Sequence, residues 1–196
     1  MINKVDTMIN KVKVPALSAV AAAVMVFATC KLVTDDDAGT RDVYSLRISS
    51  GEMSPWVEAE SDGYVACPNP EAFAGTRVNG YVQRFQDRGL IEGFVQELNG
   101  GGDIWGSVYV MDFGTAEKAN DMFVYQDAEN TQKLAVSGIA QTVAGIDNSS
   151  GDGCIGYGHF DRFYIQVSLG GYADKTDSQK DAKTFLEHFQ SKVKNM

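Results

Sequence analysis

The sequence has few of the residues on which most metal sites and catalytic centres are built. Its 196 residues include 2 histidines, 3 cysteines and 4 prolines. No cysteine belongs to a CxxC pair and neither histidine belongs to an HExxH motif, so no group of residues has the spacing of metal ligands. The GxSxG nucleophile elbow and the GxxxxGK[ST] phosphate loop are also missing. We therefore expect no catalytic residues, no metal and no cofactor.

Positive charge is also scarce. The chain has 17 lysines and arginines against 26 aspartates and glutamates, which gives a formal net charge of −9, and it contains no basic tract. Binding to nucleic acid depends on neutralising phosphates. The charge balance therefore excludes nucleic acid as an expected partner.

The one long apolar run lies near the N-terminus. Residues 1–13 carry three lysines and one acid, and the uncharged run Val14–Thr29 follows. This run is shorter than the ~20 residues that a helix needs to cross a bilayer. A basic segment followed by a short apolar segment is typical of a secretory signal. We predict a signal peptide over residues 1–29 and an exported protein.

The end of this run resembles a bacterial lipobox. Phe27-Ala28-Thr29 precedes Cys30, and a polar segment follows it. The resemblance implies that Cys30 becomes a lipidated (palmitate-bearing) N-terminus and that residues 30–42 are a tether, so the membrane is a partner through this anchor. Lys31 after the cysteine resembles lipoproteins that leave the inner membrane, which implies the periplasmic face of the outer membrane or the cell surface. A signal anchor or ordinary cleavage remains an alternative.

The other two cysteines form an even pair. In an oxidising compartment, Cys67 and Cys154 are candidates for a disulfide. Such a bridge is worth about 4 kcal/mol in the chain-entropy account. Two buried, reduced thiols are the alternative, because free cysteine is among the most buried residue types.

The residue pattern predicts one domain over 43–196. Two units follow each other in it, each with two strands and a helix. The strands are expected at 91–98, 104–113, 154–160 and 162–169, and the helices start near Thr115 and Thr176. Two such units predict an α+β fold, an antiparallel sheet with helices on one face. Residues 104–113 have apolar side chains on both faces, which is typical of a central strand.

Outside these units the pattern is weaker. Val43-Tyr44-Ser45-Leu46-Arg47-Ile48 alternates in polarity and predicts a strand. Asn69 followed by Pro70 predicts a helix start, with the asparagine as cap. A short strand is expected around residues 139–143.

Several short motifs resemble an uncharacterised family of bacterial envelope α+β proteins. The matching segments are Val78-Asn79-Gly80-Tyr81, Gly89-Leu90, Ser107-Val108-Tyr109-Val110-Met111-Asp112 with Ala116 and Ala119, and Phe160-Asp161-Arg162-Phe163-Tyr164-Ile165. The likeness covers roughly residues 70–170. It implies an α+β fold in the cell envelope but supplies no mechanism, because no activity is established for the family.

Candidate functional residues are few. The aromatic side chains could line a ligand groove, although packing in the core explains them equally well; they are Trp56, Trp105, Tyr109, Tyr157 and Tyr164. We expect His159 at an exposed or half-buried strand position and His188 on a solvated helix face. The polar segment 147–153 offers oxygen atoms to Ca²⁺ but lacks the acid spacing of an EF-hand, so a polar loop explains it more simply.

Together these observations predict a non-catalytic, exported and lipid-anchored envelope protein that binds a small ligand or an envelope partner. The alternative is a periplasmic hydrolase that uses carboxylates from separate segments, namely Glu58, Asp112 and Asp161. A pocket that holds two of these carboxylates with raised pKa values favours the hydrolase. A flat aromatic patch or an exposed sheet edge favours the binding module.

Overall fold

The computed structural model describes residues 42–60, 63–76 and 82–196. The signal peptide predicted for 1–29, Cys30, tether residues 31–41 and the Val78-Asn79-Gly80-Tyr81 motif lie outside the described residues. The elements are η1 (Val43–Leu46), β1 (Val57–Glu58), β2 (Tyr64–Cys67), α1 (Pro70–Ala74), α2 (Val82–Gln86), β3 (Glu92–Gly101), β4 (Ile104–Asp112), α3 (Ala116–Glu129), β5 (Lys133–Ala135), β6 (Ala144–Asp147), β7 (Cys154–Phe160), β8 (Phe163–Gly170) and α4 (Lys175–Lys194). Within the described ranges, none of the helices has the length and apolar character needed to cross a membrane.

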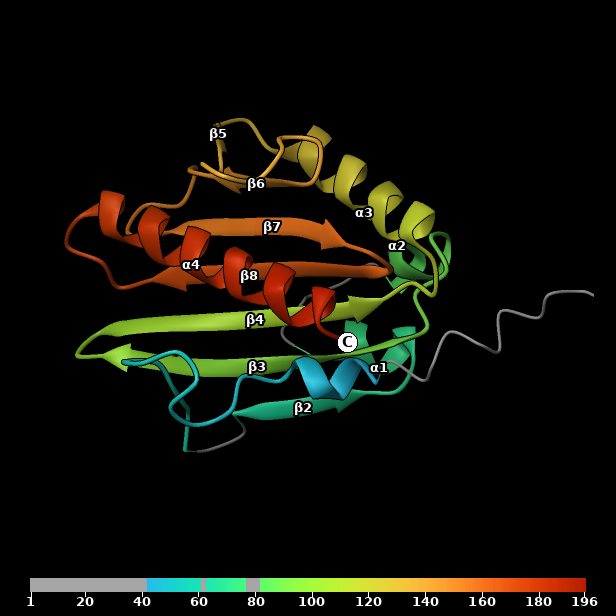
Figure 1. Ribbon diagram of the computed structural model, residues 1–196, viewed down its shortest axis with the longest axis horizontal. Helices are drawn as coiled ribbons and strands as arrows, with labels where there is room; N and C mark the ends of the chain where they lie inside the picture. The colour runs from blue at the N-terminus through green and yellow to red at the C-terminus, as the bar shows by residue number, and fades with distance from the viewer. Residues whose placement is uncertain (1–41, 61–62, 77–81) are drawn as a thin grey trace, which may run out of the picture. The chain divides into compact units, whose positions relative to one another are not determined.

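In the described residues, all strand pairs are antiparallel and form one 8-stranded sheet, in the order β1-β3-β4-β8-β7-β6-β5 with β2 also on β3. The α+β class is confirmed, and so are the two strand–strand–helix units, β3-β4-α3 and β7-β8-α4. The predicted central strand is also confirmed, because β4 lies between β3 and β8 (Figure 1).

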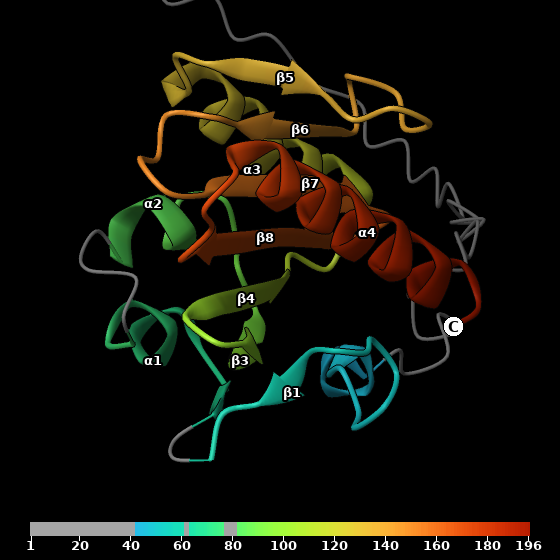
Figure 2. The same ribbon diagram turned by 90° about the vertical axis from the view of Figure 1, so that its left-hand side faces the viewer.

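The helices cover both faces of this sheet, not one as the sequence pattern predicted. Successive residues of a strand point to opposite faces. In β8, Ile165 and Val167 belong to the apolar cluster with α4, whereas Tyr164 belongs to the cluster with α1, α2 and α3. Figure 2 shows α4 on one side of the strands and α1 and α2 on the other. We refer to these sides as the α4 face and the α3 face.

The core on the α4 face joins the first and last described segments of the chain. Val43 and Leu46 of η1 and Trp56 pack in the same cluster as α4. The rings of Trp56 and Phe185 meet edge to face, with centroids 5.1 Å apart. Burial of each such side chain contributes about 1.5–3 kcal/mol, so the first and last described segments stabilise each other.

Local hydrogen bonds explain where the weaker patterns succeed and fail. The carboxylate of Asp42 accepts the amide of Tyr44 (2.9 Å) and starts a 3₁₀ turn, so Val43–Leu46 is not the predicted strand. The prediction at Asn69 is confirmed, since its side chain accepts the amide of Ala72 (2.8 Å). Residues 139–143 form a turn closed by Val143 N to Ala140 O (2.9 Å), and strand β6 begins after it.

The predicted disulfide is absent, because Cys67 and Cys154 are both free and buried. They belong to different apolar clusters, Cys67 on the α3 face and Cys154 on the α4 face. Burial raises the pKa of the Cys67 thiol to about 11. Burial also raises the pKa of Cys154, although a hydrogen bond with Ser178 opposes the rise. Both thiols are therefore protonated at neutral pH.

Candidate functional site

An open cavity of about 450 Å³ lies beside the end of strand β7. We call it the notch; the residues that line it are Ala116, Val143, His159, Phe160, Asp161, Gln190, Val193 and Lys194. They come from the start of α3, the segment before β6, the end of β7 with the turn after it, and the last turns of α4. The notch therefore joins segments that are far apart in the sequence.

The notch exists because β6, which begins at Ala144, does not extend along the last two residues of β7. The last pair between the two strands is Ala144 with Gly158, and the amide of His159 then donates to Val143 O (2.9 Å). Beyond this bond the turn at residues 140–143 carries the chain away from the sheet. The register gives Phe160 no β6 residue as partner, so this short stretch of sheet edge is open between α3 and α4.

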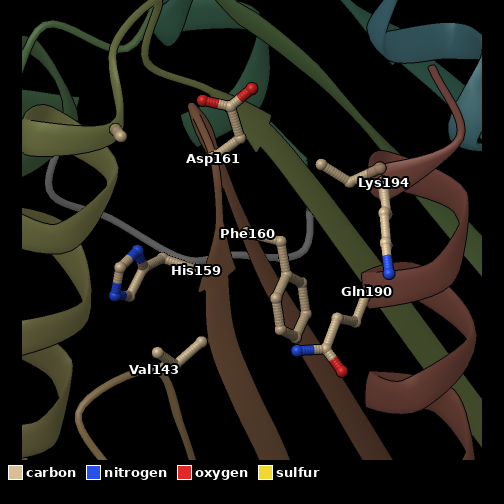
Figure 3. Close-up of a pocket in the computed structure, with 8 residues that line it drawn as sticks. Val143, His159, Phe160, Asp161, Gln190 and Lys194 are labelled. Atoms are coloured by element: carbon tan, nitrogen blue, oxygen red, sulfur yellow. The ribbon is translucent and has the colours of Figure 1, made fainter.

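The floor of the notch is apolar and its rim is polar. Phe160 and Val193 are buried, whereas Gln190 and Lys194 lie on one side of α4 and are exposed. In Figure 3 the ring of Phe160 points toward Gln190, and the imidazole of His159 points to the other side of the strand, toward α3. Nε2 of His159 lies 3.1 Å from the carbonyl oxygen of Thr142, which fixes the ring. The predicted half-buried position of His159 is confirmed.

A buried ion pair supports the turn that ends the notch. Asp161 has φ +52°, a left-handed conformation that aspartate tolerates better than most residues. The next residue, Arg162, contacts the Asp112 carboxylate (2.7 Å), which also accepts the amide of Gly114 (2.7 Å). Burial raises the pKa of Asp112, and the Gly114 amide and Arg162 offset this only in part.

The three carboxylates of the hydrolase hypothesis do not form one site. Asp161 lines the notch, and in Figure 3 its carboxylate points away from Phe160. Asp112 is 1% exposed and is bound to Arg162 beneath the turn. Glu58 lies on β1, at the other end of the strand order, and pairs with Arg47. The pocket with two carboxylates that this hypothesis required is therefore not formed by these residues.

The predicted aromatic groove is also not formed as one surface. Trp56 is buried on the α4 face, whereas Tyr109, Tyr157 and Tyr164 are buried on the α3 face. Trp105 is 49% exposed and lies at the other end of β4. These aromatics are therefore divided between the two cores and one exposed position.

Tyr157 links α3 to the sheet. Its hydroxyl donates to Asp127 (2.8 Å), which also pairs with Lys133 of β5 (2.8 Å). Burial, together with the Asp127 carboxylate, raises the pKa of Tyr157 to about 12. The hydroxyl therefore stays protonated and serves as a donor that positions α3.

The remaining candidates have structural partners. Asp147, in the polar segment 147–153, accepts the amide and the hydroxyl of Ser149, both at 3.0 Å. His188 lies 3.5 Å from Glu52, partly buried, and burial lowers its pKa. In the described parts of the chain, no three His, Cys, Asp or Glu residues are placed to hold a metal ion.

Sequence reasoning missed most of the notch. No sequence motif includes Val143, Gln190 or Lys194. Only the folding of the sheet and α4 brings these residues together. A signal was present in α4, where Gln190 and Lys194 are four residues apart beside buried Val193, a spacing that puts polar groups at the edge of an apolar stripe.

The geometry defines an α+β domain with helices on both faces of an antiparallel sheet and an open, amphipathic notch at one strand end. No protein-family model and no curated protein matches the sequence. The structure is similar to the extracellular domain of PknH from Mycobacterium tuberculosis, with a TM-score of 0.53 and 16% sequence identity, over 79% of this chain and 95% of that domain. At this identity the similarity concerns the fold alone, so this chain has a fold that also occurs in an extracellular domain.

Proposed function

We propose that this chain is an exported, lipid-anchored domain of the cell envelope that binds a small amphipathic ligand in the notch. The observation that carries the binding role is the notch itself, a cavity of about 450 Å³ with an apolar floor and a polar rim. Sites for small ligands have this combination of apolar walls and a few polar groups that orient the ligand.

The residues around the notch suit an apolar ligand with one polar or anionic group. The apolar part would contact Phe160, Val143 and Val193. The Lys194 ammonium and the Gln190 amide would take the polar group, since both are hydrogen-bond donors at the rim. Asp161 turns its carboxylate away from Phe160 and leaves room for such a group (Figure 3).

The envelope location is supported by the N-terminal pattern. The basic segment, the apolar run and Cys30 have the order of a lipoprotein signal. The fold similarity to an extracellular domain is compatible with this location. As part of the same proposal, the chain is a member of the uncharacterised family of envelope proteins that its short motifs resemble.

Binding in the notch is tested with the amphipathic anion 1-anilinonaphthalene-8-sulfonate, whose fluorescence rises in apolar surroundings. Saturable binding to the folded wild type is expected. Gln190→Trp fills the notch and should weaken this binding at least tenfold. Thr184→Trp is the matched control on an exposed position of the same helix and should leave binding unchanged. Equal binding by both variants, or no saturable binding by the wild type, would refute the role of the notch.

The anchor is tested by the intact mass of protein from the membrane fraction. A mass that fits an acylated chain starting at Cys30 is expected. Cys30→Ser should release the protein from the membrane fraction. An unprocessed N-terminus in the wild type would contradict the lipid anchor and leave the notch experiment unaffected.

A further inference from the structure

Trp105 forms an exposed aromatic surface at the end of the sheet opposite to the notch. Its side chain is 49% exposed and lies on the α3 face, as do Tyr109 and Met111 two and three pairs along β4. Its cross-strand partner is Gly170. A Cβ atom on Gly170 would lie 2.3 Å from Cζ2 of Trp105, so one face of the indole lies on this glycine. About half of the Trp105 side chain is open to solvent.

The strands extend this surface with small and polar side chains. Residues that pair across strands point to the same face. One row contains Val57, Asn99, Trp105 and Gly170, and the next contains Glu97, Ser107 and Ser168. Val57 is 52% exposed and Asn99 is exposed, whereas Ser168 is half-buried and Ser107 is buried. The hydroxyl of Ser107 donates to Glu97 (2.6 Å), which holds that carboxylate in place.

The charge around Trp105 is negative. Asp103 lies in the β3–β4 turn, and the Asp152 carboxylate accepts the amide of Gly171 (3.2 Å), next to the glycine under the ring. The segments 99–105, 151–153 and 170–174 contain no lysine or arginine. This surface therefore repels anionic partners such as nucleic acid and acidic polysaccharides.

We propose that the platform formed by Val57, Asn99, Trp105 and Ser168 binds a neutral oligosaccharide. A pyranose ring presents a face of C–H groups, which packs on the open face of an aromatic ring. Its hydroxyls both donate and accept hydrogen bonds, and the Asn99 amide and the Ser168 hydroxyl can do the same. The indole lies against Gly170 even without a ligand. Binding therefore does not have to order the ring, which lowers the entropic cost of binding.

This activity is separate from the proposed function of the notch. The notch lies at the β7–β8 turn, and the platform lies at the other end of β8. A protein with both would hold a glycan of the envelope at one end and a small ligand at the other. Because the two sites share no residue, the failure of one proposal leaves the other standing.

The two tryptophans allow a direct test. Trp56→Phe leaves Trp105 as the single tryptophan, so its emission reports on the platform alone. The probes are the neutral hexasaccharides chitohexaose and maltohexaose, with a polygalacturonate hexamer as the anionic counterpart. We expect a saturable emission shift with at least one neutral probe, with a Kd between about 10 μM and 1 mM, and none with the anionic probe. Calorimetry on the wild type replaces fluorescence if Trp56→Phe does not fold.

Variants show whether the ring is the binding group. Trp105→Ala should lower the affinity at least tenfold, and Gly170→Ala should also weaken binding because its Cβ displaces the ring. Val124→Ala, which removes another exposed apolar side chain on α3, should bind like the wild type. No saturable binding of either neutral probe up to about 10 mM, or equal binding by Trp105→Ala, overturns the proposal. In that case Trp105 serves only to cover the glycine of the neighbouring strand.

Discussion

Removal of Arg162 should destabilise the domain in a pH-dependent way. The Arg162 guanidinium is 2.7 Å from the Asp112 carboxylate, and the Asp112 side chain is only 2% exposed. Arg162→Ala leaves this buried carboxylate without its cationic partner, with the amide of Gly114 still donating to it. Breaking a buried pair in this way costs about 3–5 kcal/mol, and the 22% exposure of Arg162 favours the lower end. About 3 kcal/mol corresponds to a fall in Tm of about 6–12 °C for a domain of this size.

The pH dependence follows from the sign of the Asp112 shift. Burial raises the pKa of this carboxyl in the folded state. A raised carboxyl pKa means that the folded state binds the proton more tightly, so the stability from this group is present at low pH. It is lost as the pH rises through the folded pKa. Without Arg162 this pKa rises further. The loss in the free energy of unfolding caused by Arg162→Ala should therefore be small at about pH 4 and largest at about pH 8.

Urea unfolding across this pH range measures the effect. Combining Arg162→Ala with Asp112→Asn removes the buried charge and should abolish most of the pH dependence of the deficit. Lys183→Ala, which removes an exposed ion pair with Glu187, is the control and should cost less than about 1 kcal/mol at every pH. A deficit for Arg162→Ala that is equally large at both ends of the range, or below about 1 kcal/mol throughout, would show that the carboxylate is not buried with its charge.

Three further predictions concern packing, hydrogen bonds and thiols. Gly153→Ala should lower the free energy of unfolding by at least about 2 kcal/mol, because its Cβ would lie 1.8 Å from a β8 carbonyl oxygen. Gly151→Ala has open space there and should be nearly neutral in the same urea titration. Tyr157→Phe should cost about 1 kcal/mol because it removes the donor to α3. Tyr164→Phe should leave stability unchanged or raise it, because among the described residues its buried hydroxyl has no partner; a loss equal to that of Tyr157→Phe would contradict this. The two cysteines of the domain should react with Ellman's reagent only after unfolding, because burial raises both pKa values; rapid reaction of the folded protein would refute their burial.

The strand–strand–helix units were predictable because each depends on local patterns. The run 104–113 is apolar on both faces, and this feature already required cover on both sides of the sheet. The expectation of helices on one face ignored that requirement. An amphipathic helix shows which of its own sides is buried, but the face of the sheet that receives it is set by the connection from the preceding strand.

Long-range features were not predictable from the same patterns. The even count of cysteines indicated that a bridge was chemically available, but it carried no information on which face of the sheet each thiol occupies. The notch depends on the point at which β6 leaves β7, which a turn at residues 140–143 decides. Trp105 was among the aromatic candidates, but the glycine against which its ring lies is 65 positions later, and only strand pairing brings the two together.

The contact between Trp56 and Phe185 has a consequence for the order in which the protein can mature. The core on the α4 face needs residues from both ends of the described chain, so it stays incomplete while the ribosome still holds the C-terminal segment. Contacts of such large sequence separation also form slowly. Under the export proposed above, this late closure would keep the chain in an unfolded form that a secretion channel can accept. The same late closure leaves apolar strands exposed until the last helix is in place, which favours aggregation of the unfinished chain.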